Sequence, residues 1–289
     1  MGIRRTGMAF ALLTTGAATL MAAGPVAAAP AMPRAGGPVV RAVALAGDLA
    51  LAGVRPARFT AATVAQFQVY ATREGLVGGT TANGHVITPH DHFVSLPSGI
   101  ALSPKGTGLY SVRACTASRC GYEPVWDVGP WNTRDDYWSG RRAGWPALPV
   151  GVPQAQAAFQ SAYNGGLDQF GRRVLNPAGI DLADGTVWDD LQLSADNSWV
   201  TVTFLWYHDP RGRVETEGGP LNVRGGPGTG YPAVGMAGRY ARVPIECQAT
   251  GQSITSPFGT SRLWDRIGPG NFVSHAYVVM DAGVAAPRC

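Results

Sequence analysis

The residue best suited to acid chemistry in this sequence is Asp127. It lies between Trp126 and Val128, with Trp131 nearby, in the segment PVWDVGPW. Burial beside apolar or aromatic groups disfavours the carboxylate form and keeps a carboxylic acid protonated near neutral pH. Asp127 is therefore a candidate proton donor. The alternative is a structural role, because an aspartate before Gly-Pro also suits a turn in which its side chain accepts hydrogen bonds from backbone amides.

A second polar group is the run His90, Asp91 and His92. His92 can orient a substrate or stabilise charge, and Asp91 can serve as a second carboxylate. His90 and His92 share one face of an extended strand, where they could ligate a metal with His85; a plain polar strand face is the other alternative. We predict no metal and no cofactor. Asp181 is a further catalytic candidate, although it is also placed to cap a following helix.

Aromatic side chains are concentrated between residues 131 and 170. A groove that binds glycan needs such side chains, because flat aromatic faces stack on sugar rings. The candidate glycan-binding residues are Trp131, Tyr137, Trp138 and Trp145. We expect Trp138 and Trp145 to be exposed, since glycines and arginines flank them, and at least two aromatic residues of the segment to fill the core. The hydrogen-bonding groups expected beside them are Arg134, Asp135, Asp136, Arg141 and Arg142.

The elements that must position these residues are mostly short strands. From Phe59 onward, short apolar runs alternate with Gly, Pro and Asn, a spacing typical of a small β-barrel or sandwich. The clearest runs are 67–70, 109–114, 125–128 and 199–206.

Two helices interrupt the strands. The first begins at Pro153 and ends at Asn164-Gly165-Gly166, because apolar residues between these points recur at helical spacing. The second is expected over 185–193, with Asp184 as its cap. Its inward-facing residues are expected to be Val187, Trp188 and Leu191.

Composition excludes several classes of protein. The chain has 289 residues, of which 15% are charged and 45% hydrophobic, so it is neither a polar disordered tail nor a multi-span membrane protein. Its 39 glycines and 22 prolines indicate a loop-rich fold. The net charge of +4 is small and scattered, whereas a nucleic-acid partner requires a dense basic stripe. We therefore expect no nucleic-acid partner.

The N-terminus has the pattern of a secretory signal peptide. Arg4 and Arg5 precede an apolar stretch that is shorter than a membrane span, and small residues follow it up to Ala28. We predict a signal peptide at 1–28 and a secreted, extracellular or wall-associated protein with no membrane contact after cleavage. An uncleaved anchor is the alternative. Residues 29–58 are rich in Ala and Pro and are expected to form a tether.

Export makes the four cysteines informative, because an oxidising compartment favours disulfides. Four cysteines allow three pairings. Cys115 and Cys120 flank the tip of an expected hairpin, and Cys247 and Cys289 both lie in the last quarter of the chain. The local solution pairs Cys115 with Cys120 and Cys247 with Cys289.

Three motifs, in order, resemble a double-psi β-barrel of the rare lipoprotein A, barwin, expansin and family 45 endoglucanase group. They are GGTTANGH at 78–85, PVWDVGPW at 124–131, and Gly179-Ile180-Asp181-Leu182 before a helix and a closing strand. The resemblance covers about 59–207. It implies a mainly β fold with a six-stranded double-psi barrel and short helices, and it places Asp127 at the acidic position of the family's Asp-x-Gly-Pro.

The end of the chain resembles a bacterial SH3-like domain. The segment LNVRGGPGT at 221–229 is similar to the family's Leu-Asn-Val-Arg-Ser-Gly-Pro opening, with Gly225 in place of serine. We therefore expect a linker at 208–219 and a small SH3-like β-barrel at 220–289. The residues that would hold peptidoglycan peptide are not indicated by the sequence.

These resemblances imply a cell-wall protein. Rare lipoprotein A implies a lytic transglycosylase and family 45 implies a β-glycan hydrolase; both need a carboxylic acid to protonate the glycosidic oxygen. The first hypothesis is a secreted protein that binds, and can cleave, peptidoglycan glycan while its SH3-like domain anchors it. The alternative is a non-catalytic expansin-like wall-binding module or a secreted protease inhibitor.

Overall fold

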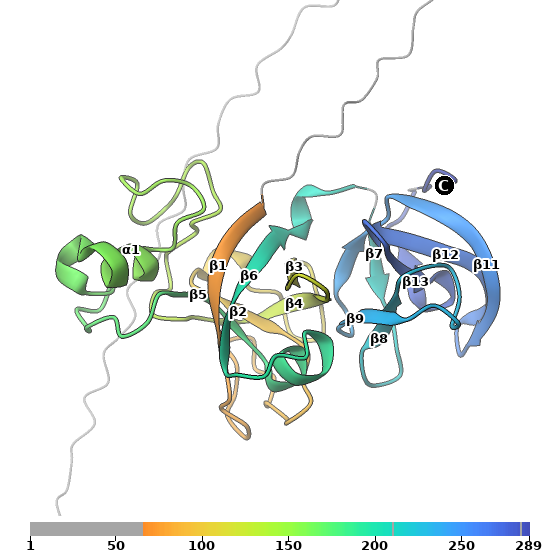
Figure 1. Cartoon of the computed structure of the whole chain (residues 1–289), viewed down its shortest axis with the longest axis horizontal. Helices are drawn as coiled ribbons and strands as arrows, with labels where there is room; N and C mark the ends of the chain where they lie inside the picture. Colours follow the sequence, from red (N-terminus) through yellow and green to blue (C-terminus); the bar gives the residue numbers. More distant parts are fainter. Residues whose placement is uncertain (1–65, 210, 284) are drawn as a thin grey trace, which may run out of the picture. The chain divides into compact units, whose positions relative to one another are not determined.

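The computed structural model describes residues 66–209, 211–283 and 285–289, and Figure 1 shows the course of the chain. The predicted signal peptide (1–28) and tether (29–58) lie outside the described residues. Within the described residues no helix is long and apolar enough to cross a membrane.

The first half of the described chain is a closed six-stranded barrel, as the sequence predicted. Its strands are β1 (Gln66–Arg73), β2 (Val94–Leu96), β3 (Ser111–Cys115), β4 (Cys120–Val128), β5 (Ala178–Leu182) and β6 (Asn197–Phe204). The pairing order β1-β6-β3-β4-β2-β5 returns to β1 and so closes the sheet. The pairs β1–β5 and β2–β4 are parallel, and the other four are antiparallel. Closure leaves none of the six strands with a free edge along its whole length.

The barrel encloses one apolar core, because inward-facing residues alternate along its strands. Val69, Leu96, Val112, Ile180 and Val202 are all fully buried in it.

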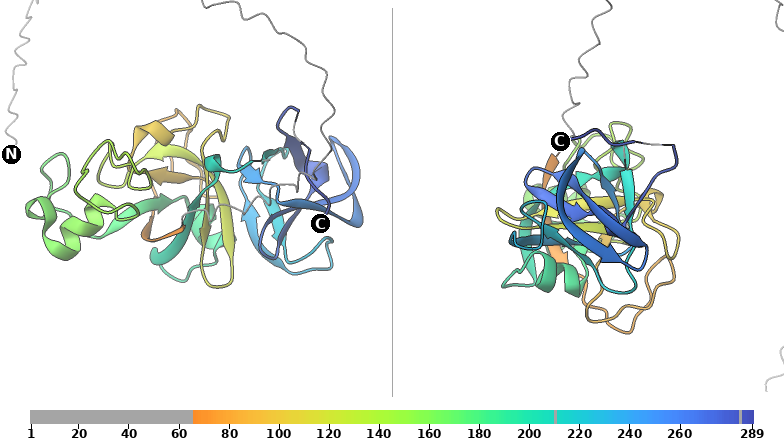
Figure 2. Two further views of the ribbon diagram at one scale, coloured as in Figure 1. Left: turned by 90° about the horizontal axis from the view of Figure 1, so that it is seen from above. Right: turned by 90° about the vertical axis from the view of Figure 1, so that its right-hand side faces the viewer.

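Helix α1 (Gln154–Ser161) lies in the long segment between β4 and β5, at the predicted place. It ends at Ala162, which takes a left-handed conformation, followed by Asn164 and Gly165 with positive φ. The same segment contains the short 3-10 turn η2 (Tyr163–Gly166), and η1 (Gly99–Ala101) follows β2. The two views of Figures 1 and 2 (left) place α1 at the opposite side of the barrel from β11 and β12.

The second predicted helix is shorter than expected. The structure has a single π-helical turn, η3 (Thr186–Asp190), with Val187 buried as predicted. Trp188 differs from the prediction: it is exposed, and the Arg73 guanidinium lies 5.7 Å from its ring centroid. Asp184 forms no helix cap and instead pairs with Arg73 at 3.1 Å.

The C-terminal half contains a second group of strands. These are β7 (Arg211–Val214), β8 (Leu221–Arg224), β9 (Ala233–Ala237), β10 (Arg242–Pro244), β11 (Cys247–Ser256), β12 (Gly259–Gly268), β13 (Asn271–Ser274) and β14 (Val278–Met280), with the 3-10 turns η4 (Leu205–Tyr207) and η5 (His275–Tyr277). Residues 208–219, expected to be a linker, thus include strand β7, which pairs with β10 and β14. Strand β7 alternates between residues that face the interior, Gly212 and Val214, and arginines that face outward. This alternation is typical of a strand with one buried face, so the charged sequence is compatible with pairing.

Strand β4 takes part in both halves. Its first residues, Cys120–Tyr122, pair in parallel with Gly235–Ala237 of β9, while Val125–Val128 pair with β2. The Tyr122 ring is fully buried in the C-terminal core, whereas Val125 is buried in the barrel core.

Both disulfides are present, in the local pairing that the sequence favours. Cys115 and Cys120 face each other at the end of the β3–β4 hairpin. Cys247 at the start of β11 is joined to the C-terminal Cys289.

Candidate functional site

Four polar side chains lie in register across neighbouring strands of the barrel. Thr72 of β1 is paired with Asp181 of β5, Asp181 is paired with Ser95 of β2, and Ser95 is paired with Asp127 of β4. Side chains at paired positions lie on the same side of a sheet. Glu74, two residues after Thr72, joins them. We call Glu74, Asp127 and Asp181 the carboxyl row; all three are half-buried.

Hydrogen bonds fix each member of the carboxyl row. The Thr72 hydroxyl donates to Asp181 Oδ1, and the Ser95 hydroxyl donates to Glu74 Oε2. Asp127 Oδ1 accepts two backbone N–H groups at 2.8 Å, from Ala82 and from Val128. Asp127 therefore accepts backbone hydrogen bonds, as expected for an aspartate with a structural role in a turn. It also lies among other carboxyl groups.

The row holds protons near neutral pH. Burial, the neighbouring Asp181 and the nearby Asp127 together raise the pKa of Glu74 to about 8, against the opposing effect of the Ser95 hydrogen bond. Burial, with a contribution from Asp127, raises the pKa of Asp181 to about 7, although the Thr72 hydrogen bond opposes it. Perturbed values of this kind suit a general acid.

Asp181 is better placed than Asp127 as the proton donor. Its Oδ1 is held by Thr72, while its Oδ2 faces Gly129, where even an added Cβ would remain 3.7 Å away. No side chain at position 129 thus covers this oxygen. Asp181 does not cap a helix, which corrects the structural role expected for it. The sequence singled out Asp127 and Asp181 but missed Glu74, which directly follows β1. Its spacing of two residues from Thr72 at the end of an extended segment was the available signal.

His92 and Asp91, the other two catalytic candidates, do not join the carboxyl row. His92 is buried, and its Nδ1 lies 2.9 Å from Asp190 Oδ1. Asp91 Oδ2 lies 2.7 Å from His85 Nε2 and accepts the Thr88 N–H at 2.6 Å. Both residues precede β2 and are outside the paired register that aligns the row.

The three histidines considered as a metal set have separate partners. His85 pairs with Asp91, exposed His90 lies 3.3 Å from Asp189, and His92 points to Asp190. All three line one pocket of about 300 Å³, whose other side includes Arg239 and Tyr240 from the C-terminal half.

The candidate aromatic residues divide into two groups. Tyr137 is fully buried and Trp138 is 7% exposed; both pack against Phe204 of β6. The expected exposure of Trp138 is therefore corrected: its large apolar ring fills the space beneath the long segment between β4 and β5. Trp131 and Trp145 are half-buried.

Trp145 lines an open pocket of about 540 Å³ together with Arg134, Gln169 and exposed Phe170. A half-buried indole beside an arginine and an exposed ring has the composition of a surface that can stack on sugars.

The polar residues of this segment differ from the expected hydrogen-bonding set. Asp135 and Asp136 are buried, as is Arg142. Arg142 Nε donates to Asp135 Oδ1 at 3.0 Å, and Asp135 Oδ2 accepts the backbone N–H of Gln154 at 2.6 Å. These groups hold the segment to the start of α1 and are not available to a glycan.

The raised pKa values predict that stability falls as pH rises. Between about pH 4, the ordinary carboxyl range, and the folded values of about 7 and 8, the folded chain binds more protons than the unfolded chain. The free energy of unfolding must therefore decrease over this interval. Urea denaturation at pH 5 and pH 8 measures the decrease, and Glu74→Gln should reduce it.

The matched control is Glu217→Gln, since Glu217 is exposed. This variant should lose as much stability between pH 5 and pH 8 as the wild type. An unchanged decrease in Glu74→Gln would show that Glu74 does not hold the extra proton.

Comparisons with known proteins assign no activity to this chain. A family model described as "Domain of unknown function (DUF8814)" matches residues 65–203, which is the barrel. Among solved structures, a Streptomyces papain inhibitor has 14% identity and a TM-score of 0.28 over 49% of this chain and 96% of its own. A mutant expansin of Clavibacter michiganensis in complex with cellohexaose has 11% identity and a TM-score of 0.27 over 76% of this chain and 97% of its own.

Two relatives come from Bacillus subtilis (strain 168), and both are uncharacterized. The chain is 44% identical to YraJ over 52 residues, which is 18% of this chain and 44% of YraJ, so it spans less than half of that relative. It is 36% identical to YraI over 84 residues, which is 26% of this chain and 70% of YraI. On that match, the chain belongs to the family of the Bacillus subtilis protein YraI.

Proposed function

We propose that the barrel binds a cell-wall glycan at the carboxyl row and can cleave it by acid catalysis. The observation that carries this proposal is the register of Asp127, Asp181 and Glu74 across adjacent strands, with two of the three protonated near neutral pH. Half-buried carboxyl groups can contact a ligand and still lose enough solvation to hold a proton.

In the proposed reaction Asp181 donates its proton to the glycosidic oxygen, and the bond between this oxygen and the anomeric carbon breaks. The positive charge that develops on the sugar is stabilised by the Asp127 carboxylate, whose position two backbone amides fix. In a lytic transglycosylase the sugar's own 6-hydroxyl then bonds to the anomeric carbon and gives its proton to the Asp181 carboxylate. In a hydrolase a water molecule does so.

The C-terminal strands have a separate part in the proposal. We assign residues 220–289 to an SH3-like module that holds the protein to peptidoglycan peptide, on the basis of the LNVRGGPGT segment at 221–229. Secretion, indicated by the first 28 residues and consistent with two disulfides, would bring both halves to the wall. Two weak sites on one chain raise the local concentration of each at the wall.

The test incubates the mature protein with intact peptidoglycan and with peptide-stripped glycan, and measures bound protein by pelleting and soluble products by mass spectrometry. Wild type should pellet with intact wall and release anhydro-muramyl products. Asp181→Asn should lower the release by at least about 100-fold, which is the lower range for loss of a general acid. Asp127→Asn should lower it too, whereas Glu217→Gln, with the same chemical change at an exposed site, should not.

If the carboxyl-row variants pellet more weakly than wild type and neither wild type nor any variant releases products, the barrel is a binding module and the catalytic part is overturned. Weaker pelleting on peptide-stripped glycan would support the peptide anchor. Inhibition of a papain-type protease without any wall binding would overturn the proposal in favour of an inhibitor.

A further inference from the structure

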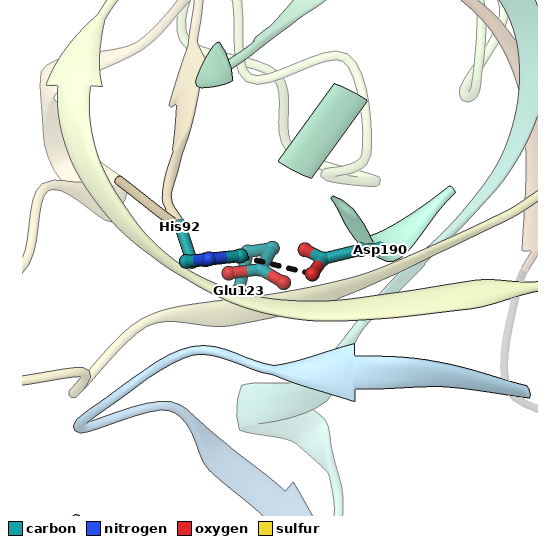
Figure 3. Close-up of side chains that lie close together, drawn as sticks. All are labelled: His92, Glu123 and Asp190. Atoms are coloured by element: carbon teal, nitrogen blue, oxygen red, sulfur yellow. Dashed lines mark ion pairs between the residues drawn. The ribbon is translucent and has the colours of Figure 1, made fainter. Parts of the chain in front are cut away.

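A second group of ionisable side chains lies in the interior, away from the carboxyl row. His92 comes from the segment before β2, Glu123 from the middle of β4, and Asp190 from the end of η3. Glu123 and Asp190 are fully buried and His92 is 7% exposed. Figure 3 shows the three side chains pointing toward one another from these separate elements. One potential ligand atom from each lies within 4.8 Å of the others.

Within the described residues the group is not satisfied by hydrogen bonds. Both oxygens of Glu123, both oxygens of Asp190 and Nδ1 of His92 have no hydrogen-bond partner. The 2.9 Å approach of His92 Nδ1 to Asp190 Oδ1 therefore brings a nitrogen and an oxygen together without the geometry of a hydrogen bond. Burial of a carboxylate without hydrogen bonds lowers the stability of the folded protein unless a cation or hydrogen-bond donors compensate its charge.

Glycines line the group on the backbone side. A Cβ at Gly238 would lie 2.5 Å from Glu123 Oε2, and a Cβ at Gly121 would lie 3.1 Å from Glu123 Oε1. A Cβ at Gly185 would lie 2.9 Å from His92 Nε2. A side chain at Gly238 or Gly185 would therefore collide with the group, and one at Gly121 would be a tight contact. The backbone packs closely against the group at all three positions and restricts where its side chains can move.

We propose that His92, Glu123 and Asp190 bind a divalent transition-metal ion of the Zn²⁺ type. One imidazole nitrogen and two carboxylate oxygens are an accepted Zn²⁺ donor set, with bonds of about 2.0–2.2 Å. Because the ligand atoms lie within 4.8 Å of one another, shifts of less than about 1 Å bring them to one ion. This assignment replaces the expectation of no metal and names a different set from His85, His90 and His92.

The chemistry of the site favours a structural role for the ion. As metal ligands the two carboxyl groups would supply two negative charges and the imidazole none, which a divalent cation neutralises. The ion would link three elements: the segment before β2, strand β4 and the turn η3. Gly238 of the C-terminal half lies next to Glu123. Of the three side chains, His92 also lines the 300 Å³ pocket.

The experiment uses the mature protein, treated with chelator and dialysed. Zn²⁺ alone is titrated into the protein and binding is measured by calorimetry. Metal analysis after gel filtration should give one ion per chain. Zn²⁺ should also raise the thermal midpoint of unfolding. Glu123→Gln and Asp190→Asn should each lower the affinity at least 10-fold and lose the rise. His90→Gln removes an exposed histidine of the same pocket and should bind as wild type does.

Circular dichroism of the chelated proteins shows whether each variant is folded. A folded wild type that binds no Zn²⁺ would overturn the proposal. So would folded Glu123→Gln and Asp190→Asn proteins that bind Zn²⁺ as tightly as wild type. In the first case the group would be a proton-sharing network, and Zn²⁺ should shift the thermal midpoint of neither wild type nor Glu123→Gln. In the second case Zn²⁺ would bind at another site.

Discussion

Replacement of Arg142 by methionine should destabilise the protein by about 3–5 kcal/mol, which is the usual cost of removing one partner from a buried ion pair. The side chains of Arg142 and Asp135 are 3% and 1% exposed. Without the guanidinium, Asp135 keeps only the Gln154 N–H as a compensating donor. Burial already raises the pKa of Asp135 despite Arg142, so the variant should bind a proton at Asp135 more readily. Urea denaturation at pH 7 measures the loss.

Arg141→Met is the matched control, because Arg141 is the exposed neighbour with the same side chain. It should change stability by less than about 0.5 kcal/mol. Arg142→Met combined with Asp135→Asn should recover part of the loss, since no uncompensated charge remains buried. Equal losses in Arg142→Met and Arg141→Met would mean that the ion pair contributes nothing.

Removal of the Cys247–Cys289 disulfide by two serine substitutions should cost about 4 kcal/mol. The bond closes a loop with a sequence separation of 42, and the entropy that a crosslink removes from the unfolded chain grows with loop length. Without the disulfide, the C-terminal residues are held to β11 by backbone hydrogen bonds. In these, the N–H of residue 289 donates to Gln248 O, and the Gln248 N–H donates to Pro287 O. Thermal and urea unfolding of the variant measure the effect.

The Cys115–Cys120 pair supplies the comparison. Its separation of 5 predicts a cost of about 2 kcal/mol for the equivalent double serine variant. A larger loss from the short loop than from the long one would contradict the loop-entropy explanation and point to contacts made by the sulfur atoms at the end of the hairpin.

Local patterns predicted the elements that depend on local physics. The apolar runs mark β1, β3, β4 and β6, the Cys115–Cys120 spacing fits the hairpin, and helix α1 ends where the positive-φ residues stand. These features need only neighbours in the sequence. The residue pattern by itself predicted a small barrel or sandwich, and the closed six-stranded barrel was implied by the resemblance of three motifs to the double-psi group.

The sequence did not predict features that depend on remote partners. Glu123 stands in an apolar strand and has no local signal for burial with His92 and Asp190, which come from distant segments. Trp138 precedes a run of serine, glycine and arginine, yet its ring packs against Phe204 and Trp206. Asp181 looked like a helix cap because η3 follows it, but the strand register turns it toward Thr72. In each case tertiary packing overrides the local preference.

The shared strand β4 limits how this chain can be cut. A fragment that ends after β6, near the end of the family match at residue 203, would lose β9 and leave Cys120–Tyr122 without its parallel partner. It would also uncover the Tyr122 ring, whose hydroxyl bonds to Ile267 and Asn271 in the complete chain. Such a fragment would present an open strand and an aromatic face to solvent, which are the features that promote aggregation. Expression of the barrel by itself therefore requires that this edge be redesigned, or that the chain be kept whole.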